Sequence, residues 1–377
     1  MNKLKLLMVA DTYYPKVDGT LRFIEEFIKR GEEFEISLLV PDLGKKKGKK
    51  VTYLKPSKIF SLSGYPNMKF SFKNLKLIKN EVRNSDLVFV QGPATISYLA
   101  TRYGYKQSKK TIFYIHVLSW ELFEKFMPTI LLKKIFYNLV KKMCIHYFNY
   151  CERIIVPYPD LKEQLIEAGV KTEIVVARLG VDIEKFTPAK NKAGAKKAIG
   201  IDGSKTVIGY VGRVSKEKNV PTLLEAFKKL ENQENLHLLI VGDGSKELIT
   251  QFKELKNCTV TGFVDNVQDY LKAMDVFVMP SLTETTSLAT LEAMATALPV
   301  IVTKVGYMKN YVVKDYNGIF FPKNSSTVLS MKIKKFIEEP GYREKLGINA
   351  RKTVAYSFSW ERSINKIKRL LLKEYYS

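Results

Sequence analysis

Residues 279–303 read MPSLTETTSLATLEAMATALPVIVT, and this stretch decides the fold. An apolar run at 276–279 stops at Pro280, and a polar loop follows it. Apolar residues then recur at helical spacing from about 287 to 297, before a second apolar run at 299–302. Strand, loop, helix and strand in this order form the unit of a parallel sheet, because parallel strands need a crossover connection. The sequence therefore predicts an α/β fold.

Two glutamates flank the start of this predicted helix. Glu284 lies in the loop, and Glu292 falls one or two turns into the helix. The helix N-terminus between them offers free backbone N–H groups and a partial positive charge, which suit a phosphate. Each carboxylate can accept hydrogen bonds from sugar hydroxyls. Two isolated glutamates would favour solvated surface positions, so the surrounding residues decide between these interpretations.

The surrounding residues resemble the signature of the retaining nucleotide-sugar glycosyltransferases of family 4, which have the GT-B architecture. That signature is a Glu, seven residues, Glu-Ala-Met-Ala, a small residue and Pro-Val; here it reads Glu284, TTSLATL, EAMA and TALPVI. The chain has Thr286 and Ser287 where the family usually has an aromatic residue and a glycine, and Ala297 where glycine is commoner. The resemblance places Thr286 and the backbone N–H groups of Ser287 and Leu288 at the phosphates of the donor.

Three further stretches match the family in the same order. In the first, Gly19 stands between a predicted strand at 4–10 and a predicted helix at about 20–30. A glycine at such a turn lets backbone N–H groups approach a phosphate, although many turns of this kind contain glycine. The family has a glycine turn here, facing the donor phosphates and the acceptor. In the second, residues 175–188, VVARLGVDIEKFTP, resemble the segment that joins the two domains.

The third match, KTVIGYVGRVSKEKN, carries two cations on a turn. Arg213 and Lys218 follow an apolar run at 207–211 and lie five residues apart. Arginine can bind phosphate oxygens through two N–H groups and lysine adds a point charge, so together they would offset the charge of a diphosphate leaving group. Two solvated loop cations are the alternative, and the match to the family favours the functional interpretation.

The resemblance also implies roles for individual side chains. Glu292 would bind the ribose of the donor, and Glu284 would bind the donor sugar. His116, at the end of a predicted strand, would lie near the C6 side of that sugar. Val264, in the loop that follows Gly-Phe and a predicted strand at 260–264, would border the nucleobase.

The composition fits two domains in a reducing compartment. A chain of 377 residues with 46% apolar residues is long enough for two buried cores. The three cysteines form no metal-ligand spacing and no even disulfide set. The N-terminal apolar run is too short for a signal peptide, and no run approaches the length of a membrane span, so we expect a cytoplasmic protein. We predict domains at 1–178 and 179–355, and a helix at 356–377 that returns to the first domain.

The formal net charge of +24 predicts an anionic partner, unless it reflects a lysine-rich composition alone. A predicted helix at 129–150 contains no acidic residue. At helical spacing, one side of it carries Lys133, Lys134, Lys141 and Lys142. The other side carries Leu132, Ile135, Phe136, Leu139, Val140 and Met143. Either the apolar side packs on the sheet and the lysines are solvated, or the helix also meets an anionic lipid surface. A second basic stretch, KKKGKK at 45–50, reads as a solvated loop.

Together these patterns predict two Rossmann-like domains with a donor cleft between them. The predicted enzyme transfers a hexosyl unit from a nucleoside diphosphate sugar, most simply UDP-linked, to a lipid or glycan hydroxyl at the inner membrane face. No Asp-x-Asp pair stands at a strand end, so we expect neither a metal nor another cofactor. A GT-B-fold epimerase or phosphorylase is the alternative, followed by a non-catalytic nucleic-acid-binding protein, for which no motif is present. The sequence leaves the sugar, the base, the acceptor and the oligomeric state open.

Overall fold

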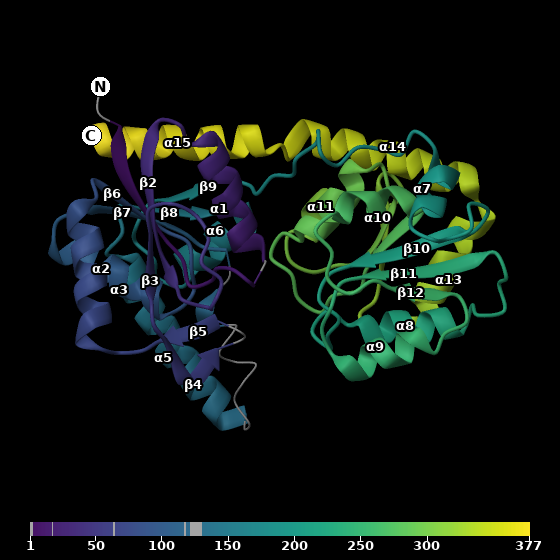
Figure 1. Ribbon diagram of the computed structural model, residues 1–377, viewed down its shortest axis with the longest axis horizontal. Helices are drawn as coiled ribbons and strands as arrows, with labels where there is room; N and C mark the ends of the chain where they lie inside the picture. Colours follow the sequence, from purple (N-terminus) through teal and green to yellow (C-terminus); the bar gives the residue numbers. More distant parts are fainter. Residues whose placement is uncertain (1–2, 17, 63–64, 117, 121–129) are drawn as a thin grey trace. The chain divides into compact units, whose positions relative to one another are not determined.

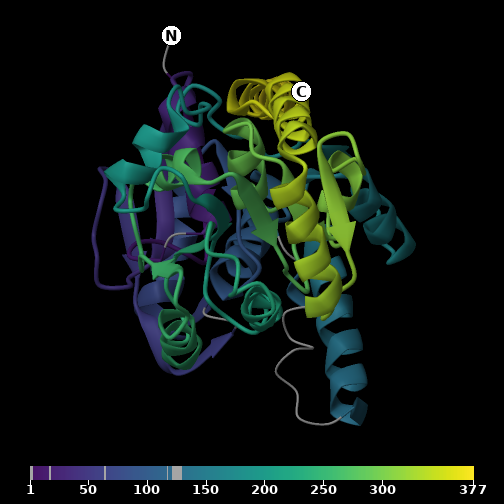
Figure 2. The ribbon, with the colours of Figure 1, turned by 90° about the vertical axis from the view of Figure 1, so that its right-hand side faces the viewer.

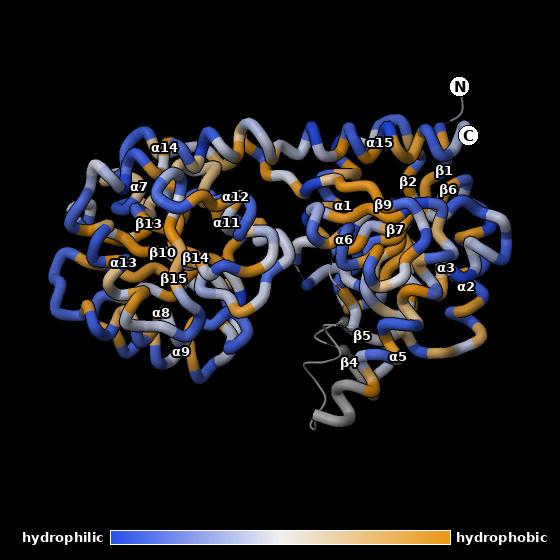
Figure 3. Tube along the Cα trace, turned by 180° about the vertical axis from the view of Figure 1, so that it is seen from behind, coloured by the Kyte–Doolittle hydropathy of each residue, from blue (hydrophilic) through white to orange (hydrophobic). Residues whose placement is uncertain are grey.

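The computed structural model describes the chain except residues 1–2, 17, 63–64, 117 and 121–129, and except the side chains of 58–67 and 130–134. The chain forms two compact units, which we describe separately. Unit 1 contains residues 1–178 and 361–377, and unit 2 contains residues 179–360. Each unit has a parallel sheet of apolar strands, with polar residues on the outer faces of its helices (Figures 1 and 3). The predicted α/β class with two Rossmann-like domains is confirmed.

Unit 1 has a seven-stranded parallel sheet in the order β3-β2-β1-β6-β7-β8-β9. Its strands are β1 (Leu4–Val9), β2 (Phe34–Pro41), β3 (Val51–Leu54), β6 (Leu87–Val90), β7 (Lys110–Tyr114), β8 (Arg153–Val156) and β9 (Ile174–Val176). An antiparallel hairpin is made by β4 (Pro56–Leu62) and β5 (Tyr65–Met68). The helices that precede unit 2 are α1 (Gly19–Arg30), α2 (Phe72–Asn84), α3 (Thr95–Lys106), α5 (Ile130–Phe148) and α6 (Pro159–Glu167).

The centre of this sheet is held to α3 by one buried carboxylate. Asp11, which follows β1 and is fully buried, accepts hydrogen bonds of 2.9 Å from the backbone N–H groups of Ala94 and Ile96. It thereby satisfies N–H groups at the start of α3 that have no partner within the helix. A Cβ atom on Gly92 would lie 2.2 Å from the Asp11 carboxylate, so this turn requires glycine.

Unit 2 has a six-stranded parallel sheet in the order β12-β11-β10-β13-β14-β15. Its strands are β10 (Thr206–Val211), β11 (Leu236–Val241), β12 (Cys258–Val260), β13 (Val276–Met279), β14 (Val300–Thr303) and β15 (Gly318–Phe321). Its helices are α7 (Lys192–Ala198), α8 (Val220–Lys228), α9 (Lys246–Lys253), α10 (Val267–Ala273), α11 (Leu288–Ala295), α12 (Met308–Tyr311), α13 (Ser326–Glu338) and α14 (Pro340–Ser357). The strand, loop, helix and strand predicted from residues 276–302 are present as β13, α11 and β14.

Two of the predicted segments differ from the structure. The strand predicted at 260–264 is β12 and ends at Val260, because Gly262 adopts a left-handed conformation with φ of 73° that breaks the extended chain. In unit 1, the short β9 pairs in parallel with β8 and overlaps the start of the segment 175–188 that was predicted to join the two domains. A strand of three residues carries too little pattern to be recognised in the sequence.

The last helix, α15 (Trp360–Tyr376), belongs almost entirely to unit 1. Arg153 of β8 donates from Nε to the carboxylate of Glu374, a residue that is 2% exposed, over 2.6 Å. Lys110 of β7 donates to the backbone carbonyl of Glu374 over 2.6 Å. At the middle of the helix, Lys368 pairs with Glu33 at 2.7 Å. These contacts fix the C-terminal helix to the sheet of unit 1.

Candidate active site

The turn after β10 presents Arg213 to solvent. Gly212 has a φ of 150°, and a Cβ atom on Gly242 would lie 2.0 Å from the Gly212 carbonyl oxygen, so the backbones after β10 and β11 are in close approach. The buried Tyr210 donates its hydroxyl to the carbonyl of Arg213 over 2.8 Å, which fixes the peptide of the turn. The Arg213 side chain is exposed, and among the described residues it makes no hydrogen bond or ion pair.

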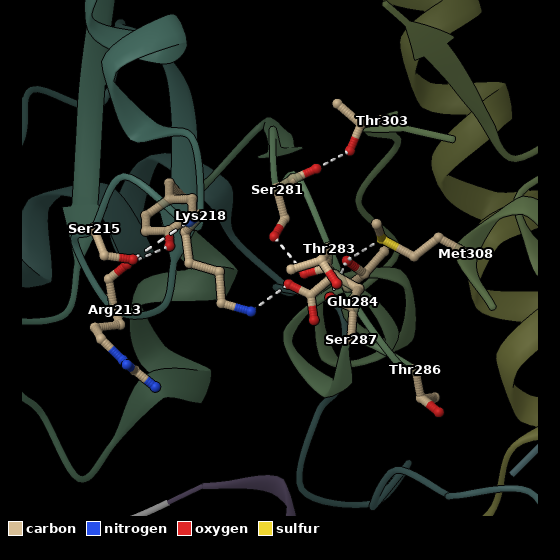
Figure 4. Close-up of polar contacts among 12 residues, drawn as sticks. Arg213, Ser215, Lys218, Ser281, Thr283, Glu284, Thr286, Ser287, Thr303 and Met308 are labelled. Atoms are coloured by element: carbon tan, nitrogen blue, oxygen red, sulfur yellow. Dashed lines mark hydrogen bonds and ion pairs between the residues drawn. The ribbon is translucent and has the colours of Figure 1, made fainter. Parts of the chain in front are cut away.

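Lys218 and Glu284 form the central contact of the candidate site (Figure 4). The Lys218 Nζ lies 2.5 Å from the Glu284 Oε1, although the two residues are 66 positions apart in the chain. The lysine side chain is 23% exposed and the glutamate side chain 9%. A backbone hydrogen bond of 3.1 Å from Leu282 to Glu217 joins their loops. Figure 4 shows the guanidinium of Arg213 extending away from this ion pair.

The loop that carries Glu284 is held by the segment that follows β14. Thr303 donates to the carbonyl of Ser281 over 2.5 Å, and Tyr311 donates to the carbonyl of Thr286 over 2.7 Å. A Cβ atom on Gly306, whose φ is 52°, would lie 1.9 Å from the carbonyl oxygen of Glu284. The loop is therefore held at Ser281, Glu284 and Thr286, on both sides of the residue that presents the Glu284 carboxylate.

Ser287 begins α11 in a left-handed conformation, with a φ of 60°. Its hydroxyl hydrogen-bonds the Thr290 hydroxyl at 2.8 Å and does not cap the helix. The N–H groups of Thr290 and Leu291 donate to the Ser287 carbonyl, so the anion-binding character of an uncapped helix N-terminus rests on the N–H groups that precede them, beginning with that of Leu288. Ala297, after the helix, has a φ of 58°. Both positions where this chain departs from the glycine of the family signature therefore need a conformation that glycine adopts without strain.

The remaining donor-side residues lie near this edge of the unit 2 sheet. Glu292 is the fifth residue of α11 and is half-buried. Thr286 is 2% exposed, and its hydroxyl oxygen has no hydrogen-bond partner in the described part of the chain. Val264 is half-buried in the loop after β12, beside Phe263, which is 61% exposed. These carboxyl-terminal strand ends are where open α/β sheets bind ligands.

His116 lies in unit 1, two residues after β7, and is 7% exposed. Its Nε2 lies 2.8 Å from the side-chain oxygen of Gln91, and its ring is 4.3 Å from that of Tyr114. Burial lowers the pKa of His116 to about 3, so the imidazole is neutral at physiological pH. Since Nε2 donates to Gln91, the proton is on Nε2 and Nδ1 is an acceptor. The Nδ1 of His116 and the amide nitrogen of Gln91 have no partner among the described residues.

Gly19 is the first residue of α1, and Asp18 is the N-cap. The Asp18 carboxylate accepts a hydrogen bond of 3.0 Å from the backbone N–H of Leu21. One of the N–H groups at the start of α1 is therefore already hydrogen-bonded to a carboxylate. An approaching phosphate would meet that negative charge there, in contrast to the start of α11.

The packing predicted for α5 is wrong for most of its apolar side, of which Val140 is buried. Of the apolar side predicted to face inward, Ile135 is 54% exposed, Leu139 61% and Met143 43%, and Phe136 is also exposed, at 39%. The described residues of α5 that are buried are Val140, Cys144 and Phe148. Their spacing of four residues is also helical, so the buried stripe shares Val140 with the predicted side but continues through Cys144 and Phe148. Figures 1 and 2 show the amino-terminal half of α5 extending past the strands of unit 1.

The lysines of α5 are described only in part. Lys142 is exposed and Lys141 is half-buried, whereas the side chains of Lys133 and Lys134 lie outside the described residues. Across the described segments, every helix is too short or too polar to cross a bilayer. In the same segments, no three His, Cys, Asp or Glu side chains lie close enough together to hold a metal ion.

Two family models match the chain in succession. One, described as Glycosyltransferase Family 4, matches residues 19–185, and the other, described as Glycosyl transferases group 1, matches residues 191–353. The chain belongs to glycosyltransferase family 4. The second match contains the Lys218–Glu284 ion pair and α11, and the first contains His116 and α5.

Relatives of this glycosyltransferase support the same conclusion. The alpha-monoglucosyldiacylglycerol synthase of Acholeplasma laidlawii is 25% identical over 352 residues, 86% of each chain. The UDP-Gal:alpha-D-GlcNAc-diphosphoundecaprenol alpha-1,3-galactosyltransferase of Escherichia coli is 32% identical, and the match spans only 53% of this chain and 54% of that relative. The crystal structure of HepE from Anabaena in complex with UDP-glucose superposes with a TM-score of 0.78 at 17% identity. It covers 98% of this chain and 100% of HepE, and the likeness shows that this glycosyltransferase has the GT-B fold.

Several residues that build the site of this glycosyltransferase were not predicted from the sequence. Tyr210 and Tyr311 fix backbone carbonyls beside Arg213 and Ser287, and Gln91 fixes the tautomer of His116. Tyr210 and Gln91 lie at or just beyond the ends of β10 and β6, and a polar group at a strand end is the signal that could have found them.

Proposed function

We propose that this family-4 enzyme transfers a hexosyl unit from a UDP-sugar to a hydroxyl group of a membrane lipid or lipid-linked glycan. We further propose that the product keeps the donor's configuration at the anomeric carbon and that no metal ion takes part. The observation that carries the proposal is the grouping of Arg213, the Lys218–Glu284 ion pair and the uncapped start of α11 at one edge of the unit 2 sheet. HepE, which was solved with UDP-glucose, supports a UDP-linked donor.

The cationic groups of unit 2 would hold the diphosphate. In the transfer, the bond from the anomeric carbon to the diphosphate oxygen breaks, a bond to the acceptor oxygen forms, and the proton of the acceptor hydroxyl passes to the departing diphosphate. Negative charge develops on the departing UDP, where Arg213, Lys218 and the N–H groups from Leu288 onward can offset it. Preorganised charges of this kind stabilise a transition state more than they stabilise the substrate.

Neutral and acidic side chains would position the sugars. Glu284, held by its rigid loop, would accept hydrogen bonds from hydroxyl groups of the hexose, and Glu292 would accept them from the ribose. His116 would accept a hydroxyl hydrogen bond at Nδ1, which a neutral imidazole with its proton on Nε2 can do. Positioning of this kind lowers the entropic cost of reaction.

The acceptor assignment rests on α5 and on the relatives. The matched proteins include a monoglucosyldiacylglycerol synthase and a galactosyltransferase that acts on a diphosphoundecaprenol-linked sugar. The exposed apolar residues Ile135, Leu139 and Met143, next to Lys142, suit insertion at an anionic membrane surface. Each lysine near such a surface contributes on the order of 1 kcal/mol, so a few acting together suffice for reversible docking. The enzyme would then act at the inner face of the membrane.

Incubation with UDP-, GDP- and other sugar donors, with and without a chelator, tests the donor side. We expect hydrolysis of a UDP-hexose that a chelator leaves unchanged, and Arg213→Ala or Lys218→Ala should lower turnover by roughly 10²-fold or more. NMR of the transfer product reads its anomeric configuration. Conversion of the donor sugar to its epimer, dependence on added phosphate, or no reaction with any donor would each contradict the proposal.

Sedimentation with vesicles tests the membrane side. Binding should require anionic lipid and fall with rising salt, because salt screens surface charge. It should weaken when Lys133, Lys134, Lys141 and Lys142 are changed to Gln, and also in the variant Ile135→Ser/Leu139→Ser, which keeps the charge. The variant Lys229→Gln/Lys253→Gln, on exposed positions of unit 2, is the control for unspecific charge. Protein that stays in the supernatant with strongly anionic vesicles at low salt would refute membrane docking.

A further inference from the structure

The basic stretch KKKGKK is an exposed loop, as the sequence predicted, but side-chain hydrogen bonds hold its backbone. Residues 42–50 connect β2 to β3, which pair in parallel, so the chain has to turn back within nine residues. Three left-handed residues make this reversal, Gly44 with a φ of 95°, Gly48 with 92° and Lys50 with 57°. The loop leaves β2 at the carboxyl edge of the unit 1 sheet, the edge at which His116 and the start of α1 also lie.

Two tyrosines fix the backbone at the middle of the loop. Tyr13, which is 4% exposed, donates its hydroxyl to the carbonyl of Lys47 over 2.8 Å. The hydroxyl of Tyr53 lies 2.9 Å from the same carbonyl and 2.8 Å from the backbone nitrogen of Lys47. The rings of Tyr13 and Tyr53 meet edge to face at 6.0 Å. A loop held through one peptide in this way presents its side chains in a defined arrangement.

The lysine side chains gather over two tyrosine rings. The Lys47 Nζ lies 4.3 Å from the ring centre of Tyr14 and 2.9 Å from its hydroxyl, and the Lys45 Nζ lies 6.0 Å from the same ring centre. The Lys46 Nζ lies 5.5 Å from the ring centre of Tyr53. We call Lys45, Lys46 and Lys47 on Tyr14 and Tyr53 the lysine cradle.

The charge of the lysine cradle is only partly compensated. Lys46 lies 3.7 Å from the carboxylate of Asp42, whereas Lys45 and Lys47 have no ion pair among the described residues. Two ammonium groups over one ring repel each other, and cation–π contacts offset only about 1 kcal/mol each at exposed sites. An anion placed between them would remove that repulsion and complete the hydrogen bonds of the ammonium groups.

We propose that the lysine cradle binds the phosphate or diphosphate group of the acceptor, an inference that rests on the proposed transfer reaction. Three ammonium groups match an anion with two or more charges, and the phenolic rings beneath them provide an apolar surface for the carbon chain or sugar next to the phosphate. The carboxyl edge of the sheet, where ligands of open α/β sheets bind, is the expected place for this group.

Binding to the UDP-saturated protein tests the proposal, because UDP occupies the phosphate-binding groups of unit 2. The ligands are inorganic pyrophosphate, geranyl diphosphate and geraniol, measured by calorimetry. Acetylation of lysines, read by mass spectrometry, locates the binding. We expect both diphosphates to bind and to slow acetylation of Lys45, Lys46 and Lys47, and geraniol to do neither.

Two variants separate the arrangement of the lysine cradle from its charge. Lys45→Gln/Lys46→Gln/Lys47→Gln should weaken diphosphate binding by about tenfold or more. Tyr53→Phe leaves the charge unchanged but removes the hydrogen bonds to Lys47, and should weaken binding about threefold. The control Lys229→Gln/Lys253→Gln/Lys256→Gln removes the same charge from exposed positions of unit 2 and should bind as the wild type does.

Three results would overturn the proposal. The first is equal protection of Lys229, Lys253 and Lys256, which would mean unspecific counterion binding. The second is unchanged affinity in Tyr53→Phe and in the triple variant of the lysine cradle. The third is protection by phosphatidylglycerol vesicles but not by diphosphates, which would make the lysine cradle a membrane contact. If the protein fails to bind UDP but pyrophosphate still slows acetylation of the lysine cradle, the donor assignment is wrong and the anion site at the lysine cradle is supported.

Discussion

Removal of the Lys218 ammonium should expose UDP to the carboxylate that Lys218 now neutralises. The Lys218 Nζ lies 2.5 Å from the Glu284 Oε1. An ammonium that also binds a phosphate oxygen would hold carboxylate and phosphate about 5 Å apart, where unit charges repel by about 3 kcal/mol at an effective dielectric constant of about 20. Because the lysine side chain is 23% exposed, we reduce this repulsion to about 1–2 kcal/mol for solvent screening.

A double-mutant cycle measures this coupling. Lys218→Ala should weaken UDP binding by about 2.5–5 kcal/mol, of which about 1.5–3 kcal/mol is the lost charged hydrogen bond and about 1–2 kcal/mol is repulsion from the Glu284 carboxylate. Glu284→Gln alone should leave the affinity for UDP nearly unchanged, because its partner would be the sugar. In the double variant, Glu284→Gln should restore about 1–2 kcal/mol, or roughly tenfold in affinity.

Calorimetry with UDP alone at low salt is the assay, and urea unfolding checks that each variant is folded. The matched control is the cycle of Arg213→Ala with Glu284→Gln. The Arg213 guanidinium extends away from Glu284 in Figure 4, so these two changes should be additive within about 0.5 kcal/mol. If Glu284→Gln fails to restore affinity in the Lys218→Ala background, the diphosphate does not lie beside this ion pair and the assignment of the donor site is wrong.

Three further predictions concern stability. His116 has a pKa of about 3 when folded and its ordinary value of 6.5 when unfolded, so the unfolded chain binds the extra proton as pH falls through this window. Between pH 6.5 and 4.5, the free energy of urea unfolding of the wild type should therefore fall by about 1.4 kcal/mol more per pH unit than that of His116→Gln. If the two free energies fall in parallel with pH, His116 is not a buried neutral imidazole. Asp275→Ala should lower the free energy of unfolding by about 3–5 kcal/mol, because the buried Lys196, now 2.7 Å from the Asp275 carboxylate, loses its ion-pair partner. A loss below about 1 kcal/mol in chemical denaturation would contradict this prediction. Ala297→Gly should stabilise unit 2 by about 0.5–1 kcal/mol. The left-handed φ costs alanine about 1–2 kcal/mol, and the greater conformational entropy of glycine in the unfolded chain cancels about half of the relief of this strain. An unchanged or lower melting temperature would refute this prediction.

The sequence by itself determined the class of fold and the donor signature. Short apolar runs such as 276–279 and 300–303, separated by a helical pattern, indicate strands of a parallel sheet covered by helices, and the structure buries both runs. The spacing of Glu284 and Glu292 followed from the local unit of loop and helix. The sequence also marked Ser287 and Ala297 as positions that glycine usually occupies in the family, and both have a left-handed φ in the structure.

Only the tertiary structure decided which groups meet. Lys218 and Glu284 lie on different crossovers, 66 residues apart, and Gln91 and His116 follow different strands, so no local spacing could pair them. For α5, helical periodicity placed Leu139 and Val140 on one apolar side, but the sheet covers Val140 together with Cys144 and Phe148 and leaves Leu139 61% exposed. The backbone of the basic loop at 45–50 likewise depends on Tyr13, in the loop after β1, and on Tyr53 of β3. Local pattern fixes the elements, whereas long-range packing fixes the pairing of charges and the surface left exposed.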